Sequence, residues 1–435
     1  MKVLFYVHEF RDRDFWPIAQ CVVNAGNPVY YAICQHVTRE TVIAVDRKLE
    51  FDLVISSDES TRMPDGAFLN VALAKKPALF ELAFDDLRDI TFRYADDDGS
   101  FSGLQRNGVC LGVMDRDLLE SVKAIGVQNV VYFPYGVPPL AITDTAYFAR
   151  RRGRRMYGEI RPDDLTATHR LDTLLSRLAH TVAGYSRRRR TTDIVFLGEC
   201  TIGPDVARLE YVATRFLKGV TVPSLLASDA RIREELMAQS ESSTFETEAG
   251  IAACALARHL RLSGEGHLVQ IGFLLLKDYY EQQVRAIRRL AYVRHLAGAF
   301  GRQFELYGDH FVQRGLRAHP TDHNSTEQKY LGAKISIDFG SVSYGCSLDT
   351  RPARIISCES LLLQLRRKDS GAVYGALSKK MTFDSRDEML AMVDSYLTSP
   401  ETAMASALDE RALSSAACGM DSIVREFLTT FEALA

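Results

Sequence analysis

The chain has 435 residues and a formal net charge of −3, from 53 Lys and Arg against 56 Asp and Glu. Hydrophobic residues make up 46% and charged residues 25%, which excludes disordered, collagen-like and coiled-coil proteins. The near-neutral balance also argues against a dedicated nucleic-acid-binding protein, which carries a strong basic excess. At roughly 150 residues per domain, the length predicts two or three domains.

The eight cysteines stand singly along the chain, with no C-x-x-C pair of the kind that holds zinc. Several lie in apolar runs, as Cys21 and Cys254 do, where a cysteine behaves as a small hydrophobic residue. This usage favours a reducing compartment. The N-terminal segment lacks the features of a signal peptide, and no apolar run reaches the roughly 18 residues of a membrane span. We therefore expect a cytoplasmic protein.

Short apolar runs alternate with helical stretches through the first 140 residues. The predicted strands are 2–7, 28–33, 51–57, 77–83, 108–113 and 129–137, and helices are expected at 14–25 and 116–125. Buried strands that alternate with helices are typical of a parallel sheet covered on both faces. Residues 1–140 therefore predict one Rossmann-like domain. Because no G-x-G-x-x-G follows the first strand, a dinucleotide-binding dehydrogenase is not expected.

Residues 141–190 are predicted to form a basic helical linker. Arginines cluster at Arg150–Arg155 and at Arg187–Arg190, with an amphipathic helix expected over 171–183. A solvated linker is the simpler interpretation of these charges. The alternative is contact with a polyanionic acceptor or an anionic membrane, near which each basic residue contributes up to about 1 kcal/mol. A membrane contact would place the protein peripherally at the inner face of the membrane.

A second alternation of strands and helices begins near residue 193. The predicted strands are 193–199, 304–308, 333–340, 360–365 and 379–385, and the predicted helices are 205–216, 227–239, 247–260, 278–300, one from 350, 387–397 and 406–434. This pattern predicts a second Rossmann-like domain and therefore an α/β protein built from two such domains.

Four segments of the second half carry a resemblance to a known family. They are DIVFLGE from Asp193, LYGDH from Leu306, YLGAKISIDFG from Tyr330 and TRPARIISCESLLL from Thr350. In this order they resemble the donor domain of GT-B glycosyltransferases, and more narrowly the spore-maturation-type (CgeB-like) family. The resemblance implies two Rossmann-like domains facing across a cleft, with residues 1–140 for the acceptor and 191–415 for the nucleotide sugar. It also implies that a C-terminal helix, 416–435, packs back on the first domain.

The resemblance places the nucleotide-sugar donor at the second domain. A helix beginning at Thr350 would offer free N–H groups to a diphosphate. Arg351 and Arg354, three residues apart, could add bidentate contacts to phosphate oxygens, which would stabilise the leaving nucleoside diphosphate without a metal. The alternative is an ordinary surface helix whose arginines pair with Asp349 or Glu359.

Further donor-binding candidates lie at strand ends or close to the arginine-led helix. They are Gly198, Glu199, Tyr307, Gly308, His310, Asp338 and Glu359. Gly198 either permits close approach of the backbone to the diphosphate or forms a simple turn. Retaining GT-B enzymes carry Glu-x-x-x-Cys-Gly at the helix start, but aligning Cys358 puts Arg354 in place of that Glu. Asp338 or Asp349 could then hold the ribose instead.

Candidates for a catalytic base follow the first strand. His8, Glu9 and Asp12 stand where a side chain could take the proton of an acceptor hydroxyl, although a polar loop would look the same. The acidic residues near 85 and 97 are expected to be solvated turns, and no metal and no resident cofactor is predicted.

The sequence thus predicts a metal-independent glycosyltransferase that moves a sugar from a nucleotide sugar to a hydroxyl acceptor, such as a glycan, in surface-glycan or polysaccharide biosynthesis. Two alternatives stay open. The Glu missing at position 354, and a further Glu often found eight residues earlier, where this chain has Cys346, favour a degenerate, transferase-like binding protein. The same architecture also serves other nucleotide-sugar enzymes such as an epimerase. No nucleic-acid partner is expected.

Overall fold

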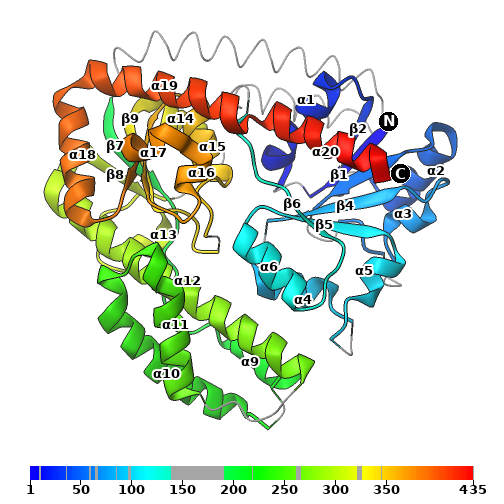
Figure 1. The fold of residues 1–435 in the computed structure, drawn as a ribbon, viewed down its shortest axis with the longest axis horizontal. Helices are drawn as coiled ribbons and strands as arrows, with labels where there is room; N and C mark the ends of the chain where they lie inside the picture. The colour runs from blue at the N-terminus through cyan, green and yellow to red at the C-terminus, as the bar shows by residue number, and fades with distance from the viewer. Residues whose placement is uncertain are drawn as a thin grey trace.

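The computed structural model describes residues 1–8, 11–35, 37–57, 60–63, 67–84, 86–96, 99–138, 191–217, 219–260, 266–320, 326–343 and 345–434. The predicted linker at 141–190, with both arginine clusters, lies outside these residues. The described chain forms two α/β domains and a long C-terminal pair of helices that reaches from the second domain to the first (Figure 1). Within these ranges, no helix combines the length and the apolar character needed to cross a membrane.

The first domain is built on a six-stranded sheet in which every neighbouring pair of strands is parallel. Its strands are β1 (Val3–Val7), β2 (Val29–Ile33), β3 (Leu53–Ser56), β4 (Ala78–Ala83), β5 (Val109–Val113) and β6 (Val130–Tyr132). Its helices are α1 (Asp12–Asn24), α2 (Arg39–Leu49), α3 (Leu69–Ala72), α4 (Leu87–Tyr94), α5 (Ser102–Arg106) and α6 (Arg116–Ala124). The central strands are buried on both faces, which is why they appear in the sequence as continuous apolar runs.

The second domain is built on a five-stranded parallel sheet. Its strands are β7 (Thr192–Leu197), β8 (Phe304–Tyr307), β9 (Ala333–Asp338), β10 (Leu361–Leu365) and β11 (Thr382–Phe383). Between β7 and β8 the chain inserts α9 (Val206–Arg215), α10 (Val222–Gln239), α11 (Phe245–His259) and α12 (His267–Phe300). The other helices are α13 (Asp309–Val312), α14 (Thr326–Gly332), α15 (Thr350–Ser357), α16 (Ser370–Tyr374), α17 (Ser378–Met381), α18 (Arg386–Thr398), α19 (Pro400–Cys418) and α20 (Met420–Leu434).

The two sheets have the same strand order. The orders are β2-β1-β3-β4-β5-β6 in the first and, from the other edge, β8-β7-β9-β10-β11 in the second. In each sheet the first strand lies between the second and the third, so the chain reverses its direction of progress there. Ligands of open parallel sheets bind at the carboxyl ends of the strands beside such a reversal. The topology therefore points to the ends of β1 and β3 and to the ends of β7 and β9.

The C-terminal helix returns to the first domain, as expected. Phe427 of α20 packs its ring 4.4 Å from that of Phe80 and 5.3 Å from that of Phe133, measured between centroids. At the crossing point, the amide of Met420 donates to the carbonyl oxygen of Val137 at 3.0 Å. Gly136 is required there, because a Cβ atom would lie 2.6 Å from the Met420 Cα. The tail is two helices rather than the single helix predicted over 406–434, with the break at Gly419.

The helical insertion also contacts the first domain. Arg208 of α9, which is 3% exposed, donates to Asp86 Oδ2 at 2.9 Å and to Asp278 Oδ2 at 2.7 Å. Asp86 caps the N-terminus of α4 in the first domain, whereas Asp278 belongs to α12. A buried guanidinium shared by two carboxylates thus ties the insertion to the first sheet.

Candidate functional site

A cavity of about 330 Å³ lies at the carboxyl ends of β7 and β9, where the strand order of the second sheet reverses. We call it the β7–β9 cavity. It is lined by Leu197, Gly198 and Glu199 after β7, Ser341, Val342 and Ser343 after β9, Asp349, Thr350, Arg351 and Arg354 at the start of α15, and Arg289, Thr326 and Tyr330 from α12 and α14. Four predicted donor-binding residues therefore meet here: Gly198, Glu199, Arg351 and Arg354.

Helix α15 is oriented by its apolar face, which buries Ala353, Ile355 and Ile356 against the domain. Its N-cap is Asp349, whose Oδ1 accepts a hydrogen bond from the Arg351 amide at 2.8 Å. Burial, and then the nearby charge of Asp338, raises the pKa of Asp349 to about 6. Asp349 is thus a carboxylate that lines the cavity and titrates close to neutral pH.

Asp338 does not reach the cavity but orients one of the arginines that does. It is fully buried, and its Oδ1 accepts from Arg351 Nη1 at 3.0 Å. Its Oδ2 accepts from Gln364 Nε2 at 2.7 Å and from the Gly340 amide at 3.0 Å. Burial would lower the pKa of Arg351, but the Asp338 and Asp349 carboxylates more than offset this and raise it. Asp338 therefore holds Arg351 charged and in place.

Arg289 of α12 is a cavity residue that the sequence analysis missed. It is 2% exposed, and its two terminal nitrogens donate to the backbone carbonyls of Glu199 and Gly340. Among the described residues, no carboxylate pairs with it and its Nε has no hydrogen-bond partner. Burial, and then the charge of Arg351, lowers the pKa of Arg289 to about 9. The nearby carboxylate, Asp338, opposes this shift in the Arg289 pKa but is paired with Arg351. A buried guanidinium without an ion pair of its own favours an anion in this cavity.

Arg354 connects the cavity to the first domain. Its Nη2 donates to Asp14 Oδ1 of α1, and its Nε lies 3.7 Å from Glu327 Oε1. With two carboxylates around it, Arg354 is engaged in a contact between domains, whereas Arg289 contacts backbone carbonyls and forms no ion pair with a carboxylate among the described residues.

Besides Asp338, four donor-binding candidates do not line the β7–β9 cavity. The hydroxyl of Tyr307 donates to Glu305 Oε2 at 2.8 Å, and His310 lies in the short helix α13. Gly308 serves packing, since a Cβ atom there would lie 2.1 Å from the Gly198 carbonyl oxygen. Glu359 follows the C-terminal end of α15, opposite the end at the cavity, and pairs with Arg411 of α19.

The predicted catalytic residues are only partly placed. His8 follows β1, and its Nε2 hydrogen-bonds with the side-chain amide of Gln35; it lines neither this cavity nor the second one described next. Asp12 is the first residue of α1. Glu9 lies outside the described residues, so the grouping of the three stays a prediction from the sequence.

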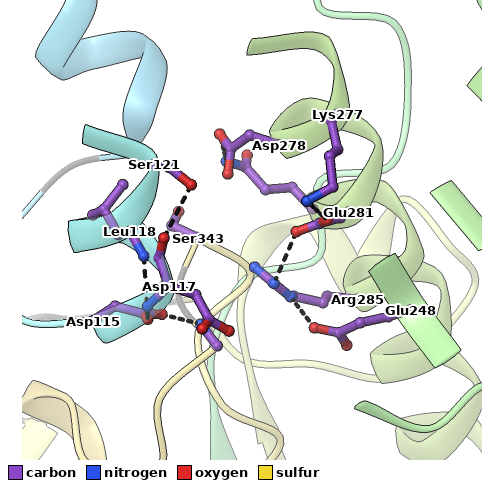
Figure 2. Close-up of polar contacts among 12 residues, drawn as sticks. Asp115, Asp117, Leu118, Ser121, Glu248, Lys277, Asp278, Glu281, Arg285 and Ser343 are labelled. Atoms are coloured by element: carbon purple, nitrogen blue, oxygen red, sulfur yellow. Dashed lines mark hydrogen bonds and ion pairs between the residues drawn. The ribbon is translucent and has the colours of Figure 1, made fainter. Parts of the chain in front are cut away.

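A second cavity of about 360 Å³ lies between the domains, and we call it the interdomain pocket (Figure 2). Its walls are Asp115, Asp117, Leu118, Glu120 and Ser121 from α6 and its cap, Glu248 and Ala249 from α11, Lys277, Asp278, Glu281 and Arg285 from α12, and Ser343, Gly345 and Lys368. Ser343 also lines the β7–β9 cavity, so the two spaces adjoin. Burial raises the pKa of Asp278 to about 7, against the opposing effect of Arg208.

The side chains that could bind a metal ion form no metal centre in the part of the chain that the structure describes. No group of three or more His, Cys, Asp or Glu side chains there is arranged to hold a metal ion. All eight cysteines are described, and each is free rather than in a disulfide.

Comparison with protein-family models finds no matching family, and comparison with curated proteins finds no matching relative. Among solved structures, the T4 phage β-glucosyltransferase is similar in fold. Its complex with UDP and Mn²⁺ and its complex with UDP-glucose each match at a TM-score of 0.46 and 9% sequence identity, covering 99% of this chain and 99% of their own. A third structure of that enzyme matches at a TM-score of 0.40 and 8% identity, covering 100% of this chain and 97% of its own.

Proposed function

We propose that this protein is a glycosyltransferase that moves a sugar from a nucleotide-sugar donor to a hydroxyl acceptor. The observation that carries the proposal is Arg289, a buried guanidinium without a carboxylate partner in the β7–β9 cavity. The diphosphate of a nucleotide sugar supplies the missing negative charge, and its oxygens accept charge-assisted hydrogen bonds from arginine. The position of the cavity beside the strand reversal supports the same assignment.

Each group at the cavity has a role in this proposal. Arg289 and Arg351 bind the diphosphate, and the N-terminus of α15 directs its positive dipole end toward it. Asp349 accepts hydrogen bonds from the ribose hydroxyls, in place of the Glu that this chain lacks. As the sugar leaves, negative charge grows on the diphosphate, and the two arginines stabilise it in the transition state. The proposed reaction needs no metal ion and no resident cofactor.

The acceptor is proposed to enter through the interdomain pocket. That pocket brings together side chains of both domains and adjoins the β7–β9 cavity at Ser343. An acceptor hydroxyl placed there would approach the donor from the side of the first domain.

Several expectations stay predictions from the sequence. They are the catalytic role of His8, Glu9 and Asp12, the spore-maturation-type family, the surface-glycan pathway, the cytoplasmic location and the membrane contact of the basic clusters.

One turnover experiment separates this proposal from its alternatives. The purified protein is incubated with a panel of nucleotide sugars, with and without a panel of simple glycosides, in buffer containing EDTA. A transferase releases nucleoside diphosphate only when an acceptor is present and joins the sugar to it. Isomerisation or hydrolysis of the donor without an acceptor would instead indicate an epimerase or hydrolase. Tight binding without any turnover would indicate a binding protein, and turnover that EDTA abolishes would contradict metal independence.

A further inference from the structure

The loop that follows β9 is held by its carbonyl groups. We call residues 339–346 the β9 loop; residue 344 lies outside the described chain. The carbonyl oxygens of four consecutive residues, 339–342, accept hydrogen bonds from guanidinium groups. Arg367 donates to Phe339 at 2.5 Å and to Ser341 at 3.4 Å, and Arg285 donates to Val342 at 3.1 Å. The Gly340 carbonyl accepts from Arg289 and also, at 3.4 Å, from Arg351. The arginines come from α12, from α15 and from the segment after β10, so three parts of the second domain fix one loop.

The first domain holds the same loop from the other side. Asp115, which is 4% exposed, accepts with Oδ2 from the amide of Gly345 and, at 3.2 Å, from that of Cys346. Its Oδ1 caps α6 by accepting from the Asp117 amide at 2.7 Å. Figure 2 shows Asp115 on the α6 side of the loop and Arg285 on the α12 side. Both oxygens of Asp115 are therefore used, one within its own domain and one across the interface.

We propose that Asp115 is a positioning residue for the donor, so that docking of the first domain sets the affinity of the second domain for diphosphate. Ser341, Val342 and Ser343 of the β9 loop line the β7–β9 cavity. Ser343 is two residues before Gly345, whose amide donates a hydrogen bond to Asp115. A loop that is already ordered loses less conformational entropy when a ligand binds. Loss of the hydrogen bonds to Asp115 would let the β9 loop move and would lower the affinity of the β7–β9 cavity for diphosphate. Asp115 itself touches no donor atom in this proposal. This inference rests on the proposed function.

Asp117 provides a matched control two residues further along. It also reaches the second domain, through a 3.1 Å contact of its Oδ1 with Lys368 Nζ. Both side chains of that pair are largely exposed, at 66% for Asp117 and 74% for Lys368. Exposed ion pairs contribute little to the stability of a fold or an interface. Asp117 thus shares the helix, the charge and the interdomain pocket with Asp115, but the hydrogen bonds from the β9-loop amides go to Asp115. Asp117 does not line the β7–β9 cavity, where pyrophosphate is expected to bind.

The test is calorimetric titration with inorganic pyrophosphate, without divalent cations, of the wild type, Asp115→Asn and Asp117→Asn. Asparagine keeps an oxygen for the α6 cap and replaces the loop-facing oxygen with an amide. We expect Asp115→Asn to bind pyrophosphate about tenfold more weakly, the loss typical of one or two charge-assisted hydrogen bonds, and Asp117→Asn to match the wild type. Hydrogen exchange should accelerate in a peptide covering 340–346 and not in one covering α6.

A second pair of variants tests the same contact without touching α6. Gly345→Pro deletes the amide that donates to Asp115, whereas Gly345→Ala keeps it, and an added Cβ would have its nearest neighbour at an ordinary 3.5 Å. We expect weaker pyrophosphate binding for proline only. Unchanged binding in both Asp115→Asn and Gly345→Pro would overturn this inference and leave the proposed function intact. A wild type that binds neither pyrophosphate nor any nucleoside diphosphate would overturn both.

Discussion

The buried carboxylate of Asp338 orients Arg351 from the end of the neighbouring strand, with 3.0 Å between Oδ1 and Nη1. Asp338 ends β9, and Arg351 lies in the first turn of α15, whose N-terminal end lines the β7–β9 cavity. The second Asp338 oxygen is occupied by Gln364 and the Gly340 amide. One residue without access to the cavity thus fixes both an arginine and the start of the β9 loop.

Replacing Asp338 should therefore weaken donor binding from outside the cavity. Asp338→Asn keeps the shape of the side chain but removes the charge that orients Arg351. We expect nucleoside diphosphate affinity to fall about tenfold, as for the loss of a charge-assisted hydrogen bond. Calorimetric titration checks this, with Asp193→Asn as the control because Asp193 pairs with Lys334 at the opposite end of the sheet. Equal affinities in all three proteins would show that Arg351 does not need Asp338.

The contact between Arg354 and Asp14 should stabilise the arrangement of the two domains. Asp14→Asn leaves Arg354 with Glu327 as its remaining carboxylate contact. We expect the free energy of unfolding to fall by about 2 kcal/mol, less than for a fully buried pair because solvent screens part of this one, and the radius of gyration in solution to rise. Urea denaturation and small-angle scattering measure the two effects. An unchanged radius of gyration would mean that the domains stay together without this pair.

Asp349 should make stability depend on pH in a defined direction. Its pKa is 3.8 for an ordinary aspartate and about 6 in the folded protein, so the folded state binds this proton more tightly than the unfolded chain. The stabilisation is fully present below about pH 4 and is lost as pH rises to about 6. Asp349→Asn removes this dependence and preserves the N-cap. Urea denaturation from pH 4 to 8 should show the stability of the wild type falling relative to the variant within that window. Parallel curves would contradict the raised pKa.

The C-terminal helix should contribute substantially to the first domain. Phe427→Ala deletes a ring that packs against Phe80 and Phe133, and we expect a loss of about 2 to 3 kcal/mol for a half-buried aromatic. Leu413→Ala on α19 is the control, since Leu413 is 54% exposed. Thermal unfolding should separate the two variants, and a similar melting temperature for both would show that α20 is not part of the first domain's core.

The architecture was accessible from the sequence because strands buried on both faces appear as continuous apolar runs. Helix starts were less accessible. Helix α12 was expected from Asp278 but begins at His267, and α10 was expected from Ala227 but begins at Val222, where Thr221 caps it and Pro223 follows. That Thr and Pro signal was available in the sequence. The tail was predicted without its break, because the close approach of Met420 to Gly136 is a tertiary contact.

The site was only half predictable for a similar reason. Local motifs located Gly198, Glu199, Arg351 and Arg354, which follow a strand or begin a helix. Arg289 lies in the middle of a 34-residue helix and reaches the cavity only through packing, so no local pattern marks it. Glu359 was assigned by alignment to a helix-start motif, but α15 is only eight residues long and ends before it. Asp115 acts across the domain interface, a relationship that sequence spacing does not encode.

The most direct test of the central claim is calorimetric titration with a panel of nucleoside mono- and diphosphates on the wild type, Arg289→Gln and Arg294→Gln. Arg294 lies on the same helix but is exposed, which makes it the matched control. We predict selective binding of one nucleoside diphosphate by the wild type and by Arg294→Gln, and binding weakened ten- to a hundredfold in Arg289→Gln. Equal binding by all three proteins, or no nucleotide binding by the wild type, would contradict the account.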